Sequence, residues 1–326
     1  LLTKFENLTF ADLKRLEYLY INNNKIKYLE PTLFDDLRNL IFLDLSSNRI
    51  KLFDTRLFKA LINLDRLILS ENELKIISPN LNSIVIHLGF NNLNLNFNKL
   101  QYIKRRYFSN RNLTSLKYLA IKSNQVSLIE PRSFKFLENL ELLDLQSNCL
   151  VKITKEILYG LKGLKTFNLE LNSIIYIEPN SFEYLNDLIE LNLKNNQLTN
   201  IYQNTFTGLI RLIYLNLASN KIHNLEINSF NILPNLEYLN LLNNQIKIFN
   251  IAYPSKLLYL DISYNKLEYV RIGKKLKLAF VNNNRFLKQI DFVNYNNLEA
   301  LKLDETSSEL INTIKFDRFP NLNALG

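Results

Sequence analysis

Cysteine, histidine, glycine and proline are scarce in this chain of 326 residues, which has one Cys, two His, six Gly and seven Pro. A single cysteine leaves no internal disulfide, and no Cys/His spacing suits a zinc site. No glycine-rich phosphate-binding loop is present, and the low glycine and proline content leaves no candidate linker between domains. No apolar run approaches the roughly 20 residues needed to span a membrane.

Leucine and asparagine, in contrast, recur in a fixed frame. The pattern L-x-x-L-x-L-x-x-N-x-L appears, for example, as LELLDLQSNCL from Leu140 and LIYLNLASNKI from Leu212. Its asparagine recurs every 24 residues between Asn124 and Asn244. A fixed period of this size predicts a repeat solenoid, in which each repeat buries its apolar side against its neighbours.

Each repeat is expected to contain one short strand that turns its leucines inward and the intervening residues outward. The frame asparagine, such as Asn148, follows the strand, and its burial is tolerable only if its amide bonds to main-chain groups. We therefore interpret Asn148 as scaffold. Cys149 comes next, at a position that is polar in other repeats: Lys25, Arg49, Gln125, Lys221 and Gln245. It is either a neutral replacement at the surface or a thiol that pairs with a partner chain.

The spacing resembles the typical 24-residue class of the leucine-rich repeat family over the whole chain. The back half of that repeat has a phenylalanine, which matches Phe34, Phe58, Phe134, Phe182, Phe206, Phe230 and Phe316. The resemblance implies an α/β solenoid shaped like a horseshoe. It implies a parallel β-sheet on the concave face and irregular or short helical turns on the convex face.

The frame also predicts how the chain is divided. We expect a single solenoid over residues 1–326 that is cut within a repeat at both ends. The unit with Asn91 at the frame position is degenerate, and residues 93–112 after it are either an insertion or a local repacking of the convex side. The units that end in Asn265 and Asn284 are shorter and lack the phenylalanine turn, which should change the local curvature.

No combination of side chains suggests catalysis. His87 and His223 lie in units far apart along the stack, and Cys149 has no obvious base partner. Three aspartates would face the concave side, but many strands apart, so that they cannot share acid/base work: Asp44, Asp144 and Asp261. We expect no enzyme activity, no cofactor and no metal site.

The net charge of +9 raises the question of a polyanionic partner, because basic surfaces attract polyanions. The densest basic groups lie in two segments: Lys104, Arg105 and Arg106, and then Arg271, Lys274, Lys275 and Lys277. Elsewhere the lysines are scattered at outward positions, so a solubilising surface is the competing explanation.

The outward residues of the sheet form rows, because adjacent strands lie roughly 4.8 Å apart. We predict a partner-binding site at Tyr214, Asn216, Tyr238, Asn240, Leu242, Tyr259, Asp261, Tyr264 and Phe280. Exposed aromatic rings beside a row of amides suit a protein interface. Tyr18 and Tyr118 occupy the same repeat position as the first tyrosine of the site, so tyrosine is alternatively just the usual residue there.

The resemblance implies a function as well. This repeat class belongs mostly to extracellular animal proteins, such as Toll-type ectodomains, chaoptin-like adhesion proteins and secreted mosquito immune proteins. It implies a non-catalytic ectodomain or secreted protein that binds another protein on its concave face, as a homo- or heterodimer, in immune recognition or cell adhesion. The glycosylation triplets at Asn7 and Asn112 fit secretion, although an asparagine-rich chain also produces such triplets by chance. The alternative is binding of an acidic glycan or nucleic acid through the basic outer surface, with nucleic acid the less expected partner.

Overall fold

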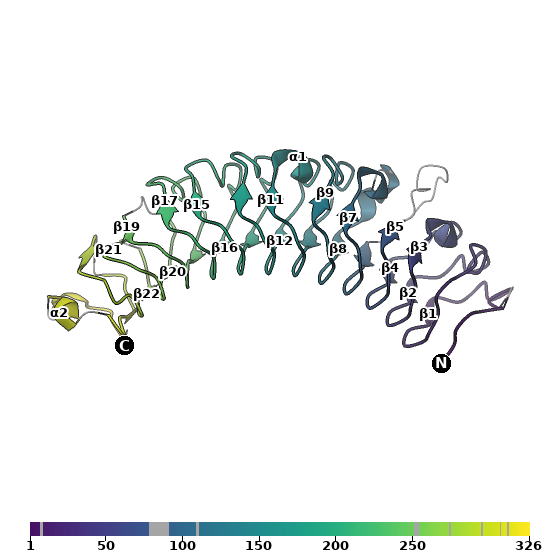
Figure 1. The fold of residues 1–326 in the computed structure, drawn as a ribbon, viewed down its shortest axis with the longest axis horizontal. Coiled ribbons are helices and arrows are strands. Elements are labelled where there is room, and N and C mark those ends of the chain that lie inside the picture. The colour runs from purple at the N-terminus through teal and green to yellow at the C-terminus, as the bar shows by residue number, and fades with distance from the viewer. Residues whose placement is uncertain are drawn as a thin grey trace. The chain divides into compact units, whose positions relative to one another are not determined.

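The computed structural model describes residues 1–6, 9–77, 91–108, 111–250, 254–273, 275–294, 296–306, 308–311 and 313–326. It contains two compact units. Unit 1 comprises residues 1–150 and 156–167, and unit 2 comprises residues 151–155 and 168–326. Each unit is a stack of repeats in which successive strands lie side by side (Figure 1).

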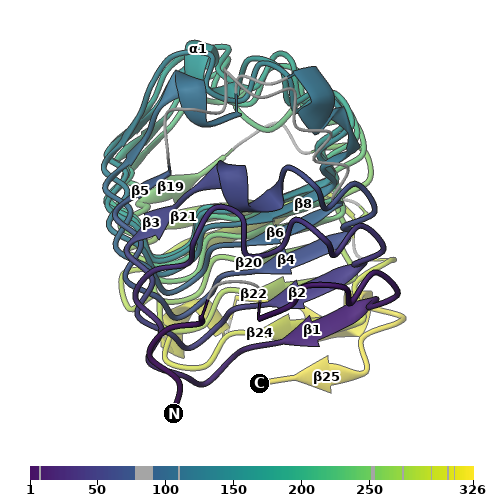
Figure 2. The same ribbon diagram turned by 90° about the vertical axis from the view of Figure 1, so that its right-hand side faces the viewer.

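Unit 1 is built around a parallel sheet with one strand per repeat. The paired strands follow chain order: β1 (Tyr18–Tyr20), β2 (Phe42–Asp44), β4 (Arg66–Ile68), β6 (Asn92–Asn94), β8 (Tyr118–Ala120) and β10 (Leu142–Asp144). Two short parallel pairs lie on another side of the coils than the main sheet. They are β3 (Leu52–Phe53) with β5 (Ile76–Ile77) (Figure 2), and β7 (Tyr102–Ile103) with β9 (Leu128–Ile129). The outer turns include η1 (Thr55–Phe58), η3 (Arg105–Phe108) and η4 (Arg111–Ser115).

Unit 2 repeats this arrangement, and β12 (Thr166–Asn168) contributes its last residue to it. Its main sheet contains β14 (Glu190–Asn192), β16 (Tyr214–Asn216), β18 (Tyr238–Asn240), β20 (Tyr259–Asp261), β22 (Leu278–Phe280), β24 (Ala300–Lys302) and β25 (Ala324–Leu325). Its back strands are β11 (Lys152–Ile153) with β13 (Tyr176–Ile177), β15 (Asn200–Ile201) with β17 (Asn224–Leu225), and the sheet β19 (Ile248–Phe249), β21 (Tyr269–Ile272) and β23 (Gln289–Phe292). The short helices are α2 (Ser308–Ile311) and η5 (Phe316–Arg318), and α1 (Lys155–Leu158) contributes only its first residue to this unit.

The core consists of the frame leucines and the phenylalanines of the back half. Leu215 and Leu217, which flank an outward asparagine in one repeat, are both fully buried. The buried rings of Phe182, Phe206 and Phe230 follow one another at centroid distances of 6.3 and 5.9 Å. Each ring therefore fills the space between its own repeat and the next. The core of a solenoid is built in this way, from contacts between neighbouring repeats. The predicted parallel-sheet solenoid is confirmed.

The frame asparagines are buried and bonded to the backbone of two repeats, as the sequence predicts. Asn196 donates from Nδ2 to the carbonyl oxygens of Leu169 at 2.9 Å and Leu193 at 3.0 Å. Its Oδ1 accepts from the amide of Ile174 at 2.9 Å. Asn148, the frame asparagine of LELLDLQSNCL, makes the equivalent bonds and is 7% exposed. The buried amides are thus satisfied, which removes the cost of burying them.

The residue before each frame asparagine has a left-handed backbone, a feature that the sequence analysis missed. The positive φ angles lie between 51° and 57° at Asn23, Ser47, Glu71, Phe97, Ser123, Ser147, Leu171, Asn195, Ser219, Asn243, Tyr264 and Asn283. This conformation turns the chain at the end of the strand. Asparagine and serine fill most of these positions, in keeping with the tolerance of short polar side chains for this region.

One frame assignment is wrong. Asn98, not Asn91, is the frame asparagine of its repeat, because it is buried and its Nδ2 donates to the carbonyl of Leu69 at 2.9 Å. Residues 92–94, which overlap the predicted insertion at 93–112, form strand β6 of the main sheet. The asparagine-rich stretch offers several candidate frames, and the buried leucines on either side of Asn94 select this one.

At two phenylalanine positions the structure differs from the sequence prediction. Phe108 stands ten residues after Asn98, at the usual spacing for the back half of a repeat, and is buried with its ring 5.9 Å from that of Phe134. Phe316, predicted to fill this position near the end of the chain, is half-buried, whereas Phe319 is buried.

The prediction of a single domain cut at both ends stays a prediction. In the part of the chain described, no helix is long and apolar enough to cross a membrane.

Candidate functional site

The predicted tyrosine row lies on the exposed face of the main sheet of unit 2. Tyr214, Tyr238 and Tyr259 are direct register partners on the consecutive strands β16, β18 and β20. Tyr214 is 49% exposed, and Tyr238 and Tyr259 are half-buried. The leucine after each tyrosine is fully buried, so the alternation of the strand keeps the tyrosines on the outside.

The rings of this row touch one another and extend to Phe280. The Tyr238 and Tyr259 rings are stacked, with 4.0 Å between centroids and 9° between planes. Tyr214 lies 5.8 Å from Tyr238, and Phe280 lies 5.3 Å from Tyr259. Phe280 belongs to the neighbouring row of the next strand, so the contact with Tyr259 is diagonal. We call these four rings the aromatic row.

The phenol of Tyr259 is held in its neutral form. Burial is the main factor that raises the pKa of this phenol, and the hydrogen bond with Tyr238 and the nearby charge of Asp261 raise it further. An ionised phenolate is therefore disfavoured at Tyr259. This residue presents an apolar ring face together with a neutral hydroxyl group.

The amide row beside the tyrosines has a role in the scaffold. Asn216 accepts at Oδ1 from the amide of Ala218 at 3.1 Å, and Asn240 accepts from Leu242 at 2.9 Å. Asp261 accepts in the same way from the amide of Ser263 at 3.0 Å. Such a bond to the backbone two residues ahead caps the end of the strand. The side-chain oxygens of this row therefore bond to the backbone. Contact with a partner is not needed to explain why Asn or Asp occupies these positions.

The same cap occurs in unit 1, where Asp44 accepts from the amide of Ser46 at 2.8 Å and Asp144 accepts from Gln146 at 3.0 Å. The other two predicted site residues lie in turns after the strands. Leu242 is half-buried, and Tyr264 is 54% exposed with a φ of 54°. They border the aromatic row without belonging to it.

Unit 1 supplies a comparison for the aromatic row. Tyr118 occupies the same repeat position as Tyr214 and is 42% exposed, but its register partners are Asn92 and Leu142. Tyr20 and Phe42 form a diagonal pair on this face, with 5.1 Å between their centroids. The sequence analysis missed this pair because it looked for runs of aromatic residues over several consecutive repeats.

The basic residues from Arg271 to Lys277 do not gather on one face of unit 2. Lys277 pairs with Glu299 at 2.8 Å beside the main sheet, whereas Arg271 lies in the back strand β21. Arg105 donates from its backbone amide to Glu130 and from Nε to the carbonyl of Pro131. Lys274 lies outside the described residues.

The remaining candidate residues stand apart. Cys149 is exposed with a free thiol, and His223 is exposed with Nδ1 3.2 Å from the carbonyl of Lys221. Asn7 and His87, like the side chain of Asn112, lie outside the described part of the chain. Among the described residues, no group of three or more His, Cys, Asp or Glu side chains could hold a metal ion.

Comparison with known proteins agrees with this repeat architecture. Among solved structures, the TLR13 chain of a complex with ssRNA13 is 24% identical with a TM-score of 0.71, covering 95% of this chain and 49% of that chain. A leucine-rich repeat protein of Leptospira interrogans is 25% identical with a TM-score of 0.61, covering 99% and 93%. The leucine-rich repeat domain of APL1B is 22% identical with a TM-score of 0.65, covering 82% and 74%.

The chain spans about half the length of the TLR13 chain, and the likeness to TLR13 and APL1B shows the fold alone. Comparison with curated protein sequences finds no match. The family model described as leucine rich repeat matches residues 1–50, 89–150, 138–198 and 187–246. Since these matches cover more than half of the sequence, the chain belongs to the leucine-rich repeat family.

Proposed function

We propose that this chain is a non-catalytic recognition module that binds another protein through the aromatic row of unit 2. The leucine-rich repeat fold in general supports a protein-binding or recognition role. The observation that carries the specific proposal is the contact of four rings over four consecutive strands, with Tyr214 half exposed at one end. Aromatic rings with polar tips are enriched at protein interfaces.

The packing of the row supports an interface further. Stacking against neighbours limits the rotamers of Tyr238 and Tyr259 before any partner arrives, so binding loses less side-chain entropy. The rigid strands below fix the spacing of the rings. Tyr118 also lies on a paired strand, but it lacks such ring neighbours among the described residues.

An extracellular role in immune recognition or cell adhesion is the finer part of the proposal. It rests on likeness to TLR13 and to APL1B, together with the resemblance of the repeat to extracellular proteins. The TLR13 structure is a complex with single-stranded RNA, so an RNA partner is the main competitor to a protein. The capped amide row counts against RNA, because one acceptor position of each oxygen that could read a base edge is already bonded to the backbone.

The test is residue-specific crosslinking followed by measurement of affinity. A photo-crosslinking amino acid at Tyr214 should capture a defined protein partner from the native source of the chain, and the same group at Tyr118 should not. With that partner, Tyr214→Ala should weaken binding by about 1–2 kcal/mol, whereas Tyr118→Ala should leave it unchanged. The two tyrosines share a repeat position and similar exposure, so they are a matched pair.

Capture of the partner at both positions, or of RNA at Tyr214, would contradict the proposed site. Thermal unfolding of each variant must be measured alongside binding. Equal losses of stability and affinity in both variants would mean that tyrosine at this position only supports the repeat.

A further inference from the structure

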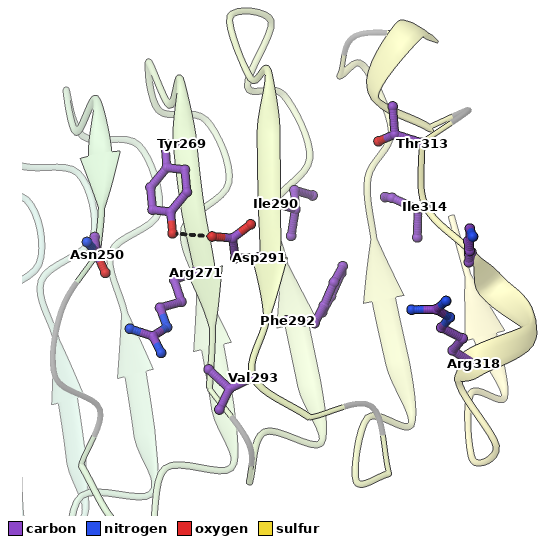
Figure 3. A pocket seen from close by; sticks show the side chains of 11 residues that line it. Asn250, Tyr269, Arg271, Ile290, Asp291, Phe292, Val293, Thr313, Ile314 and Arg318 are labelled. Atoms are coloured by element: carbon purple, nitrogen blue, oxygen red, sulfur yellow. Dashed lines mark hydrogen bonds between the residues drawn. The ribbon is translucent and has the colours of Figure 1, made fainter.

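A cavity on the back sheet of unit 2 carries charged groups that the main sheet does not use. It has a volume of about 550 Å³ and lies between strands β21 and β23 on one side and residues 313–318 on the other (Figure 3). Its charged lining residues are Arg271, Asp291, Lys315 and Arg318. The lining thus has three cationic side chains and one carboxylate.

The short repeats explain why a cavity forms here. Asn265 follows Asn244 by only 21 residues, and Asn284 follows Asn265 by 19, so the phenylalanine turn is missing. The back strands β21 and β23 have four residues each, whereas β11 and β13 in a full-length repeat have two. The next repeat again has an outer segment, with α2 and η5, and this segment lies across the cavity from the bare strands.

Asp291 is held in place as an anion. The Tyr269 hydroxyl donates to Oδ2 of Asp291 at 2.6 Å (Figure 3). Nε2 of Gln289 donates to Oδ1 of the same carboxylate at 2.9 Å. These bonds, the first above all, hold the pKa of Asp291 below its usual range, and Arg271, its register partner on β21, adds to the effect. The fixed carboxylate can only accept hydrogen bonds from a ligand.

The cations lie apart in the cavity. Arg318 reaches toward Phe292 from the outer segment, whereas Arg271, on the strand next to that of Asp291, points toward Asn250 and away from the ring (Figure 3). Phe292 is half-buried and held edge-on against Phe319, with 4.9 Å between centroids and 86° between planes. The cavity therefore combines separated positive groups, a rigid ring and one acceptor.

A ligand that suits this cavity must accept bonds from the cations and donate bonds to Asp291. A simple polyanion such as oligophosphate lacks donors and would be repelled by the carboxylate. We propose that the cavity binds an acidic carbohydrate, whose sulfate or carboxylate groups meet Arg271, Lys315 and Arg318. Its hydroxyl groups donate to Asp291, and its ring lies over Phe292. The volume is in the range of small-molecule sites.

Calorimetry on the whole chain at constant ionic strength tests this proposal, with a sulfated uronic disaccharide prepared from heparin as the probe. The disaccharide should bind, and the double variant Lys315→Gln with Arg318→Gln should weaken binding at least about tenfold. The control is the double variant Lys221→Gln with Lys266→Gln, which removes the same charge from exposed positions of unit 2 and should bind as the wild type does.

Asp291→Asn separates an acidic sugar from a simple anion. It should weaken the disaccharide about fivefold, because the charged acceptor is lost, whereas it would strengthen binding of inorganic sulfate. The proposal is overturned if sulfate binds as tightly as the disaccharide, if Asp291→Asn strengthens the disaccharide, or if both double variants behave alike. Tyr214→Ala should not affect the disaccharide, so this result is independent of the proposed protein interface.

Discussion

At the scale of single residues, the repeat imposes a backbone conformation on whatever side chain stands before the frame asparagine. Asn195 and Asn243 suit the left-handed region, but Leu171 and Phe97 have the same φ of 55° without a short polar side chain. For an ordinary L-residue this region costs roughly 1–2 kcal/mol. These two residues are therefore locally unfavourable positions that the rest of the repeat overcomes.

The substitution Leu171→Asn should stabilise the protein by about 0.5–1 kcal/mol, because it relieves this backbone cost at a side chain that is 47% exposed. Thermal or urea unfolding measures the change. The reverse substitution in the next repeat, Asn195→Leu, should destabilise by a similar amount. If neither variant shifts the unfolding midpoint, the left-handed turn imposes no preference on the side chain.

The substitution Asn196→Leu should cost about 1–3 kcal/mol, since it leaves the amide of Ile174 buried without its partner and removes one of the two side-chain bonds to the carbonyl of Leu169. Urea unfolding compared with the wild type gives this value. An unchanged midpoint would mean that backbone rearrangement or water replaces the hydrogen bonds of the Asn196 side chain. Gln197→Leu, at the half-buried position next to it, is the control and should change stability by less than about 0.5 kcal/mol.

At the scale of repeat elements, the corrected frame at Asn98 makes Phe108 a core residue. Phe108→Ala should cost about 3–5 kcal/mol, because the ring is 3% exposed and packs against Phe134. Phe97→Ala, at a ring that is 50% exposed, should change stability by less than 1 kcal/mol. A small effect at Phe108, measured by urea unfolding, would restore the insertion predicted for residues 93–112.

Repeats with a regular period could be predicted from the sequence because the same residue types recur at the same spacing. The strand, the buried leucines and the bonded asparagine of the repeat that contains Asn196 all follow from one frame. The frame failed at Asn91, where asparagine is so frequent that the letter itself carries little information. There, alternation of buried leucines around Asn94 would have been the better guide.

The candidate sites show the same limit. The row of Tyr214, Tyr238 and Tyr259 could be predicted because parallel strands in register turn a sequence period into spatial neighbours. The stacking angle and the caps made by the neighbouring amides depend on side-chain rotamers, which a period does not specify. The cavity around Asp291 could not be predicted, since it arises where short repeats break the period and Lys315 comes from the following repeat.

At the scale of the whole molecule, the positive charge is spread and partly paired between adjacent repeats. Lys165 pairs with Glu141 at 2.8 Å in unit 1, and Arg211 pairs with Asp187 at 2.8 Å in unit 2. Such exposed pairs contribute little to stability, but they neutralise charge locally. The net charge of +9 therefore gives a general attraction for polyanions more than a dedicated nucleic-acid site.

Single-stranded RNA should accordingly be retained weakly at low salt and released by about 0.2 M salt, because binding that rests on released counterions falls steeply with ionic strength. Filter binding over a series of salt concentrations measures the slope. RNA of scrambled sequence should behave identically. Retention at that salt concentration, or a preference for one sequence, would favour the RNA alternative over a protein partner.

The hydrogen bonds of the frame asparagines also give the solenoid a direction. Asn48 bonds to the carbonyl of Ile21 and accepts from the amide of Ile26, both in the repeat before it, and Asn196 does the same for Leu169 and Ile174. A repeat is thus completed by a side chain that leaves the ribosome one period later, about 1–5 s at ordinary rates of synthesis. During translation the growing edge of the stack always exposes unmet backbone groups, and each new repeat closes the one before it.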